Sequence, residues 1–249
     1  MKNVIITGGA KGIGRCIAEN FIKQKDRVFI IDKDQFAIDK MKENNSIMAY
    51  CGDIADKKDL ENFVEEVLKM ISSVDVIVNN ACFSNGGLEN CSYEDFNEVL
   101  RVGVSAPFYL VQLCMPYLSN NASIINISST RAYMSQANTE SYSAAKGAIS
   151  ALTHAMSVTL AHKARVNSIS PGWIECGEYQ WHDTKIEHSQ EDDLQHPAAR
   201  VGVPQDIANM VLYLAGHQSQ FITGENINID GGMTKLMIYH DDHGWQFHQ

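Results

Sequence analysis

The chain has 249 residues, of which 45% are hydrophobic and 20% charged. These proportions exclude a disordered tail protein, a collagen-like fibre and a mini-protein that needs disulfides. The 20 basic and 30 acidic residues give a formal net charge of −10, so we expect no nucleic-acid partner and no anionic membrane surface as a partner.

Residues 1–249 are predicted to form one domain, because no Gly-, Pro- or Ser-rich linker interrupts them. The first apolar run, Val4–Ile6, is far shorter than the apolar region of a signal peptide. No apolar run approaches the length of about 18 residues that a membrane span needs. The six cysteines are scattered without a C-x-x-C pair, which favours reduced thiols. We therefore expect a soluble, cytoplasmic protein.

Short, apolar, β-branched runs alternate with amphipathic segments along the chain. Leu60, Phe63, Val64 and Val67, for example, have the i, i+3, i+4 spacing of a helix with one apolar face. The alternation predicts an α/β fold of the Rossmann type: a doubly wound, mostly parallel, seven-stranded sheet flanked by helices, with ligands at the carboxyl ends of the strands. The predicted strands are Val4–Thr7, Val28–Ile31, Ile47–Cys51, Val74–Val78, Ser123–Ile127, Val166–Ile169 and Ile227–Ile229.

A glycine-rich turn, Thr7–Gly14, follows the first predicted strand and precedes a helical run over Arg15–Lys25. Glycines permit a tight turn and close approach of the backbone to a pyrophosphate, and the N–H groups that begin the helix attract the anion. The alternative is an ordinary turn, which the position between strand and helix disfavours.

Asp32 ends the second predicted strand. A carboxylate there can accept hydrogen bonds from both hydroxyls of an adenosine ribose and repels a 2′-phosphate, which favours NAD over NADP. Lys11 and Lys33 weaken that preference, and the alternative for Asp32 is a strand-end turn residue.

Tyr142 and Lys146 lie four residues apart in a segment predicted to be helical to about Ala161. This spacing places the phenol and the ammonium on one helix face, where the positive charge stabilises a phenolate for acid/base chemistry. Alone, the pair would be an ordinary surface contact.

In combination, these segments resemble the short-chain dehydrogenase/reductase family in its compact, single-domain form, and the resemblance covers almost the whole chain. The matching segments are the T-G-x-x-x-G-x-G turn at Thr7–Gly14, Asp53 after the third strand, Asn79–Ala81, Asn126–Ser129, Tyr142 with Lys146, Pro171–Gly172, Pro204–Ala208 and Ile222–Gly232.

The resemblance implies direct hydride exchange between nicotinamide C4 and a carbon that bears a hydroxyl. Tyr142 is the implied acid/base, Lys146 assists it and binds the nicotinamide ribose, and Ser129 holds the substrate oxygen. No metal is implied. The expected cofactor-binding residues are Gly8, Lys11, Gly12, Ile13, Gly14, Asp32, Lys33, Asp53, Ile54, Asn80, Ala81, Cys82, Tyr142, Lys146, Pro171, Gly172 and Ile174.

Two positions depart from the family pattern. Cys82 stands where a glycine usually lines the cofactor. In the predicted long helix Tyr93–Leu118, Gly103 occupies the place of an asparagine whose backbone kinks the helix and holds a water in the proton path. We carry over no catalytic asparagine; Ser105, other waters or backbone carbonyls are the alternatives.

Residues 173–203 are expected to form a lid over the substrate. Aromatic and acidic side chains there suit a sugar or polyol and disfavour an acidic substrate, although a solvated mobile loop would have the same composition. Cys176 replaces a threonine that usually contacts the cofactor amide. The lid's aromatics are Trp173, Tyr179 and Trp181, its acids are Glu175, Glu178, Asp183, Glu187, Glu191, Asp192 and Asp193, and its cations are Lys185 and Arg200.

A tail over residues 234–249 follows the last predicted strand. His240, Asp241 and His243 are a weak metal-site candidate without a rigid scaffold, whereas Trp245 and Phe247 suit packing against another subunit. By resemblance, we expect a homotetramer or homodimer.

The sequence thus predicts an NAD-dependent oxidoreductase that acts on a secondary alcohol or ketone, with a sugar or polyol as the first candidate. The alternatives are a hydroxysteroid dehydrogenase, a 3-oxoacyl reductase that uses NADP, and a nucleotide-sensing module that has lost turnover.

Overall fold

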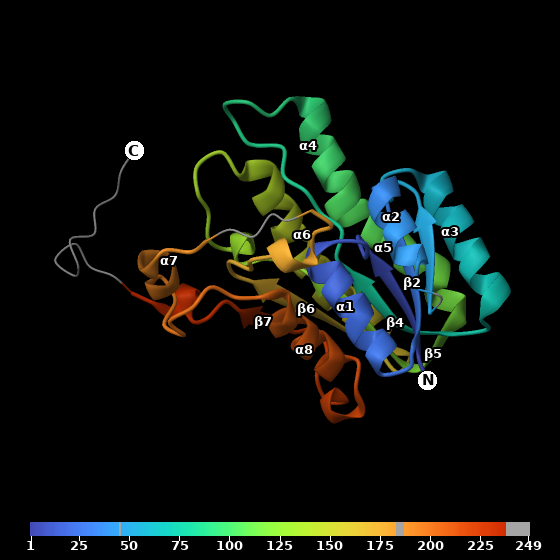
Figure 1. Cartoon of the computed structure of the whole chain (residues 1–249). Coiled ribbons are helices and arrows are strands. Elements are labelled where there is room, and N and C mark those ends of the chain that lie inside the picture. The colour runs from blue at the N-terminus through green and yellow to red at the C-terminus, as the bar shows by residue number, and fades with distance from the viewer. Residues whose placement is uncertain (45, 183–186, 238–249) are drawn as a thin grey trace.

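A central parallel sheet organises the molecule. The computed structural model describes residues 1–44, 46–182 and 187–237, and Figure 1 shows helices packed on both faces of the sheet. The strand order is β3-β2-β1-β4-β5-β6-β7, and every described pair is parallel, so the predicted doubly wound sheet is confirmed. The strands are β1 (Asn3–Thr7), β2 (Arg27–Asp32), β3 (Ile47–Cys51), β4 (Val74–Asn79), β5 (Leu118–Ile127), β6 (Ala164–Pro171) and β7 (Asn226–Ile229).

The chain first builds the sheet outward from β1 to β3, then crosses over to place β4 on the other side of β1. This reversal opens a crevice between the carboxyl ends of β1 and β4, where ligands of such sheets bind. The helices are α1 (Gly12–Lys23), α2 (Gln35–Lys42), α3 (Lys57–Met70), α4 (Tyr93–Leu100), α5 (Ala106–Cys114), α6 (Glu140–Thr159), α7 (Gln190–Leu194) and α8 (Pro204–Leu214).

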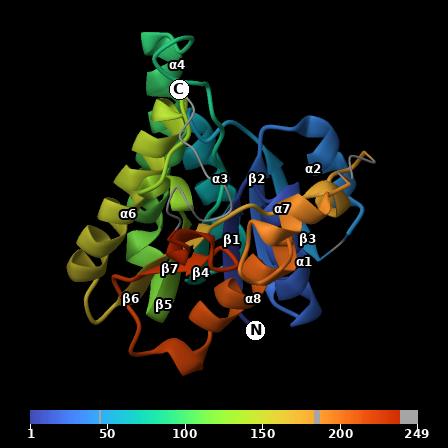
Figure 2. The same cartoon turned by 90° about the vertical axis from the view of Figure 1, so that its left-hand side faces the viewer.

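Alternate side chains of the strands divide the core into two layers. Val4 and Ile6 of β1 belong to the layer under α1, α2 and α8, whereas Ile5 between them belongs to the layer under α3, α5 and α6. Figure 2 shows α1 and α6 on opposite sides of the strands. Phe21 and Phe63 are fully buried anchors of the two layers, and the sheet ends are thereby held in fixed positions.

The predicted strands all lie within observed ones, and the helices differ at their ends. The first helix ends at Lys23 rather than Lys25, because Lys25 adopts a left-handed φ of 64°. It begins at Gly12, three residues earlier than predicted. The short helix α2 was not predicted; the Asp34 side chain caps it by accepting a hydrogen bond from the Ala37 N–H at 3.0 Å.

The predicted long helix Tyr93–Leu118 is interrupted. A π-helical turn over Arg101–Ser105 separates α4 from α5, and β5 begins at Leu118. Pro107 has no N–H with which to bond the Gly103 carbonyl, and the Ala106 N–H donates to the Arg101 carbonyl instead.

The stretch Tyr93–Tyr117 is long and apolar enough, by length and composition, to cross a membrane. Its side chains at Val99, Val102 and Leu110 are buried in the core. Burial of this kind is what the core helix of a globular protein requires.

Candidate active site

The glycine-rich turn between β1 and α1 is closely packed against its neighbours. Gly8 and Gly12 have φ values of 62° and 56°, the left-handed region that favours glycine. A β-carbon at Gly14 would lie 2.1 Å from the Gly8 carbonyl oxygen. Among the described residues, no side chain caps the start of α1 at Lys11, so backbone N–H groups remain for an anionic ligand.

A cavity of about 770 Å³ lies beside this turn at the carboxyl ends of β1 to β4. Its volume and the exposed helix start fit a dinucleotide. Eleven of the residues expected to bind the cofactor line it: Gly8, Lys11, Gly12, Ile13, Asp32, Lys33, Asp53, Ile54, Asn80, Ala81 and Cys82.

Other lining residues were not singled out from the sequence as cofactor-binding. Ile31, Asp34 and Gly52 are neighbours in sequence of residues that were predicted to bind the cofactor. Their position at strand ends could therefore have indicated that they line the cavity. Phe83 and Val102 line the cavity from the chain after β4 and the π-helical turn, and Cys176 and Gln180 from the segment after β6.

Six expected cofactor residues do not line this cavity: Tyr142 and Lys146 of α6, and four others. Gly14 is buried under the turn, and Pro171 is buried at the end of β6. Gly172 borders a different cavity, and Ile174 pairs with Gly202 in an isolated parallel bridge.

Asp32 bonds to the backbone on both sides of the cavity. One carboxylate oxygen accepts a hydrogen bond from the Ala10 N–H at 3.2 Å, and the other accepts one from the Asp34 N–H at 3.1 Å. The second bond is that of a turn residue, so the alternative interpretation of Asp32 describes part of its environment; its contact with a ribose stays a prediction. Asp53 likewise accepts a hydrogen bond from the Ala55 N–H at 2.9 Å.

The two lysines near the adenine side of the cavity are both engaged. The Lys11 ammonium lies 2.6 Å from an Asp34 carboxylate oxygen, and this hydrogen bond is the main cause of the lowered pKa of Asp34. The Lys33 ammonium lies 5.1 Å from the centre of the Phe83 ring, within cation–π range.

Thr7 and Asn80 tie the ends of β1 and β4 together. The Thr7 hydroxyl oxygen accepts hydrogen bonds from the Asn80 and Ala81 N–H groups at 3.1 and 3.2 Å. The Asn80 amide in turn donates to the Gly8 carbonyl at 2.9 Å. The wall of the crevice is therefore held by hydrogen bonds on both sides.

Tyr142 and Lys146 lie on α6, and Ser129 follows β5. Lys146 is 4% exposed; its Nζ donates to the Ile127 carbonyl at 2.7 Å and lies 5.3 Å from the centre of the Tyr142 ring. The Ser128 hydroxyl donates to the Lys146 carbonyl at 3.0 Å, which fixes α6 against the end of β5.

Gly103 lies in the π-helical turn, close to both α6 and Cys82. A β-carbon at Gly103 would be 3.0 Å from the Ala145 β-carbon and 3.8 Å from the Cys82 sulfur. A larger side chain at this position would therefore press on the residue before Lys146. The two departures from the family pattern are neighbours in space.

A second cavity, of about 360 Å³, adjoins Ser129 at the carboxyl ends of β5 and β6. Its lining residues are Ser129, Thr130, Arg131, Met134, Ser135, Gln136, Gly172, Trp173, Gln195 and Met233.

The described part of the predicted lid packs on α1. The Trp181 Nε1–H donates to the Ala10 carbonyl at 2.9 Å, and the Arg15 guanidinium stacks on the Trp181 ring at 3.6 Å from its centre. Trp173 meets His188 edge-on, with ring centres 5.2 Å apart. Asp183 and Lys185 of the predicted lid, and His240, Asp241, His243, Trp245 and Phe247 of the tail, lie outside the described residues.

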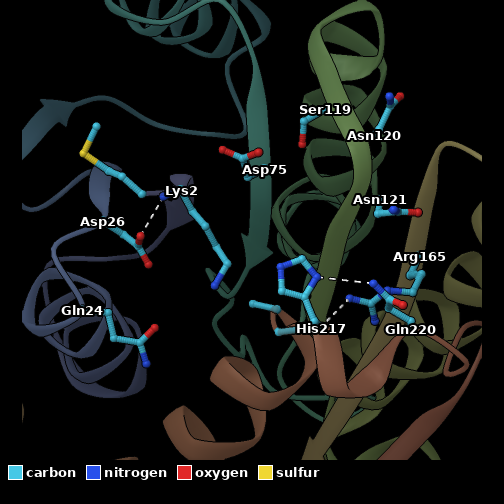
Figure 3. Close-up of a pocket in the computed structure, with 13 residues that line it drawn as sticks. Lys2, Gln24, Asp26, Asp75, Ser119, Asn120, Asn121, Arg165, His217 and Gln220 are labelled. Atoms are coloured by element: carbon cyan, nitrogen blue, oxygen red, sulfur yellow. Dashed lines mark hydrogen bonds between the residues drawn. The ribbon is translucent and has the colours of Figure 1, made fainter.

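A third cavity, of about 500 Å³, lies at the amino ends of the strands, where Figure 3 shows Asp26, Arg165 and His217 around it. Arg165 donates to the Leu214 carbonyl at 2.7 Å and to the Ser219 carbonyl at 3.0 Å. These bonds satisfy carbonyls at the end of α8, so the buried guanidinium has a structural task there.

Comparison with known proteins relates the whole chain to oxidoreductases. Residues 8–234 match the family model described as enoyl-(acyl carrier protein) reductase. An uncharacterised oxidoreductase of Thermotoga maritima is 37% identical, covering 96% of this chain and 98% of that protein.

Two solved structures are similar over nearly the full length. An apo SCOR enzyme from Clostridium thermocellum superposes with a TM-score of 0.91 at 44% identity, covering 100% of this chain and 99% of that one. A Brucella melitensis protein described as short-chain dehydrogenase/reductase SDR:glucose/ribitol dehydrogenase gives a TM-score of 0.84 at 29% identity, covering 93% and 96%.

Proposed function

Because the chain belongs to the short-chain dehydrogenase/reductase family, we propose that this oxidoreductase uses NAD and exchanges a hydride with a secondary alcohol or ketone. The observation that carries the proposal is the buried Lys146 ammonium. It donates a hydrogen bond to the Ile127 carbonyl and lies 5.3 Å from the Tyr142 ring centre. Ile127 is two residues before Ser129 in the chain, so the three side chains belong to one region.

In the proposed mechanism, Tyr142 accepts the hydroxyl proton of an alcohol or returns it to a ketone. The nearby Lys146 ammonium stabilises the phenolate form. The Ser129 hydroxyl orients the substrate oxygen and stabilises the charge that develops on it. The nicotinamide supplies the hydride chemistry when the dinucleotide is bound. The turn from Gly8 to Gly14 would hold the pyrophosphate of that dinucleotide.

The charges around the adenine side support NAD. Asp32 presents a carboxylate to the cavity, which would repel a 2′-phosphate. Lys11 is paired with Asp34 and is therefore not free to neutralise that phosphate. A 3-oxoacyl reductase that uses NADP would need the opposite arrangement.

A hydroxylated compound related to the sugars is the proposed substrate class, since the Brucella relative is described as a glucose/ribitol dehydrogenase. The hydroxyl and amide groups of Ser135, Gln136 and Gln195 in the Ser129 cavity suit a hydroxylated ligand.

A nucleotide-sensing module without turnover is the second candidate. The observation that favours it is the Cys82 sulfur beside Gly103. Gly103 supplies no side-chain amide for the family's proton path, and Cys82 adds a side chain where a glycine usually lines the cofactor. The same experiment separates the two candidates.

That experiment follows reduction of NAD and NADP by absorbance across sugars, polyols, cyclic alcohols and hydroxysteroids, with Tyr142→Phe as the matched variant. We expect turnover with NAD that is lost by about 100-fold or more in the variant, while NAD affinity is retained. Tight NAD binding without turnover on the whole panel would favour the sensor, and equal activity of the variant would contradict the role of Tyr142.

A homotetramer is the proposed assembly. Large apolar side chains are exposed on the long helices and near the last strand: Tyr93 is 78% exposed, Phe108 48%, Val158 76% and Phe221 104%. Exposed apolar side chains on these elements suit contacts with other subunits. Sedimentation equilibrium should give a mass four times that of the chain, and a monomer would contradict the proposal.

A further inference from the structure

The cavity beside Ser129 differs in charge from the rest of the molecule. Among its described lining residues, Arg131 is the one that carries a formal charge; the others supply hydroxyls, amides, thioethers, backbone and the Trp173 ring. The whole chain has a formal net charge of −10. Arg131 therefore places a single positive charge next to the proposed reacting centre, where it can bind an anionic group of a ligand.

Three acidic residues of the neighbouring segment bond within that segment and form no ion pair with Arg131. Glu175 accepts a hydrogen bond from the Gly177 N–H at 2.5 Å and lies 3.6 Å from His188. Asp192 caps α7 by accepting from the Ser189 N–H at 2.9 Å, and Asp193 accepts from the Val201 N–H at 3.0 Å. These carboxylates are used inside their own segment, so its acidic composition does not describe the cavity.

The Arg131 guanidinium has N–H donors that no described residue accepts. Its Nη2 donates to the Gln136 side-chain oxygen, and in the described part of the chain it forms no ion pair. A guanidinium has five N–H donors in a planar fork that matches a carboxylate. The remaining donors are free for one.

The position of Arg131 relative to Ser129 is fixed by the backbone. The Ser129 hydroxyl oxygen accepts a hydrogen bond from the Arg131 N–H at 3.1 Å and caps the 3-10 turn Thr130–Ala132. The group that would orient the substrate oxygen and the charged side chain therefore lie on one rigid turn.

Resting on the proposed oxidoreductase function, we propose that the substrate is a hydroxylated carboxylic acid whose carboxylate binds Arg131, rather than a neutral sugar or polyol. One cation in about 360 Å³ balances a carboxylate of one charge better than a phosphate of nearly two. Gln136 and Gln195 remain for further hydroxyls.

The reaction leaves the carboxylate unchanged. The carbon–hydrogen bond at the alcohol breaks as its hydride passes to nicotinamide C4, and the hydroxyl proton passes to Tyr142. The secondary alcohol is oxidised to a ketone and NAD is reduced, so the product is a keto acid.

The test compares matched substrates, each acid beside its neutral counterpart: an aldonate against the alditol of equal chain length, and a hydroxy acid against its amide. Phosphorylated alditols form the third arm. With NAD saturating, we expect kcat/KM for acids to exceed that for neutral partners and phosphates by about tenfold or more. Wild-type preference for the neutral compounds or the phosphates would overturn the proposal.

Arg131→Gln removes the charge and keeps a polar side chain, and Arg131→Lys keeps the charge without the fork. We expect Arg131→Gln to lower kcat/KM for acids by about 10- to 100-fold, mainly through KM, with less than about threefold change for neutral partners. Arg131→Lys should fall between. Arg101→Gln, at an exposed arginine paired with Glu98, is the control and should match the wild type.

A binding measurement separates this proposal from the proposed function. Calorimetric titration of the enzyme–NADH complex with a non-reacting carboxylate should show binding that Arg131→Gln weakens by a similar factor. Equal affinity in the variant would overturn the carboxylate site while leaving the oxidoreductase intact. Absence of nucleotide binding and of turnover on every alcohol would overturn the oxidoreductase itself.

Discussion

The Lys11 ammonium and the Asp34 carboxylate form an ion pair of 2.6 Å at the edge of the large cavity, next to Asp32. The pair joins the glycine-rich turn to the start of α2. It engages the lysine within the glycine-rich turn, so the charge at this side of the cavity is set by Asp32 and Asp34 together.

Replacing Asp34 by serine should therefore relax the preference for NAD. Serine still caps α2, while Lys11 becomes free to meet a 2′-phosphate. We expect kcat/KM with NADP to rise by about threefold to tenfold, with little change for NAD. Steady-state kinetics with both nucleotides measures this, with Asp39→Ser on the exposed face of α2 as control. An unchanged ratio would show that Asp32 acts alone.

Arg165 should matter for stability and not for catalysis. Arg165→Met leaves the Leu214 and Ser219 carbonyls without their charged donor, at a cost of about 2–4 kcal/mol in the free energy of unfolding. Urea denaturation measures the loss. NAD affinity should be unaffected, because the cavity beside Arg165 lies at the amino ends of the strands, away from the glycine-rich turn. A stable variant would contradict the structural role, and Arg101→Met serves as the surface control.

Asp206 should make stability depend on acid pH. Two hydrogen bonds from Arg200, of 2.7 and 2.8 Å, hold the pKa of Asp206 below its ordinary value. Its contribution is therefore complete above the unfolded pKa of about 3.9 and is lost as the pH falls through the lower folded value.

The corresponding variant is Asp206→Asn. It should be about 1 kcal/mol less stable than the wild type at pH 7, and the difference should narrow as the pH approaches 3. Chemical denaturation at several pH values measures both. A difference that is constant or grows in acid would refute the pairing as its origin.

The Cys176 thiol should be unreactive near neutral pH. Burial, and secondarily the charge of Glu175, raise the pKa of Cys176 to about 11. At pH 8 its thiolate is scarce, so iodoacetamide should alkylate Cys176 about 100-fold more slowly in the folded than in the unfolded protein. Peptide mass spectrometry after timed labelling measures the rate; rapid labelling of the folded protein would contradict the assigned environment.

Much of the lining of the large cavity could be predicted from the sequence, because it depends on local order. Glycines directly after a strand and Asp32 at the end of the next must meet once the strands run parallel. Phe83 and Gln180 could not be predicted in the same way, since their chain segments reach the cavity only through long-range packing. The π-helical turn was missed because a period of 3.6 fits both flanking helices.

The substrate side shows a different limit. Composition gave the residue 173–203 segment an acidic character, and an acidic substrate was disfavoured on that ground. Composition does not say that Glu175, Asp192 and Asp193 bond within their own segment. Arg131 was not predicted to be a site residue, because a single arginine two residues after Ser129 has no periodicity and belongs to no predicted motif.

The hydrogen bond from Trp181 to the Ala10 carbonyl, together with the stacking of Arg15 on the same ring, has a thermodynamic consequence. The segment that contains Trp173 of the Ser129 cavity rests directly on the glycine-rich turn, so a ligand that shifts one would shift the other. Binding linkage is reciprocal: whatever factor the nucleotide adds to the affinity for substrate, the substrate adds to the affinity for nucleotide. In such an enzyme, dissociation of one ligand would lower the binding affinity for the other.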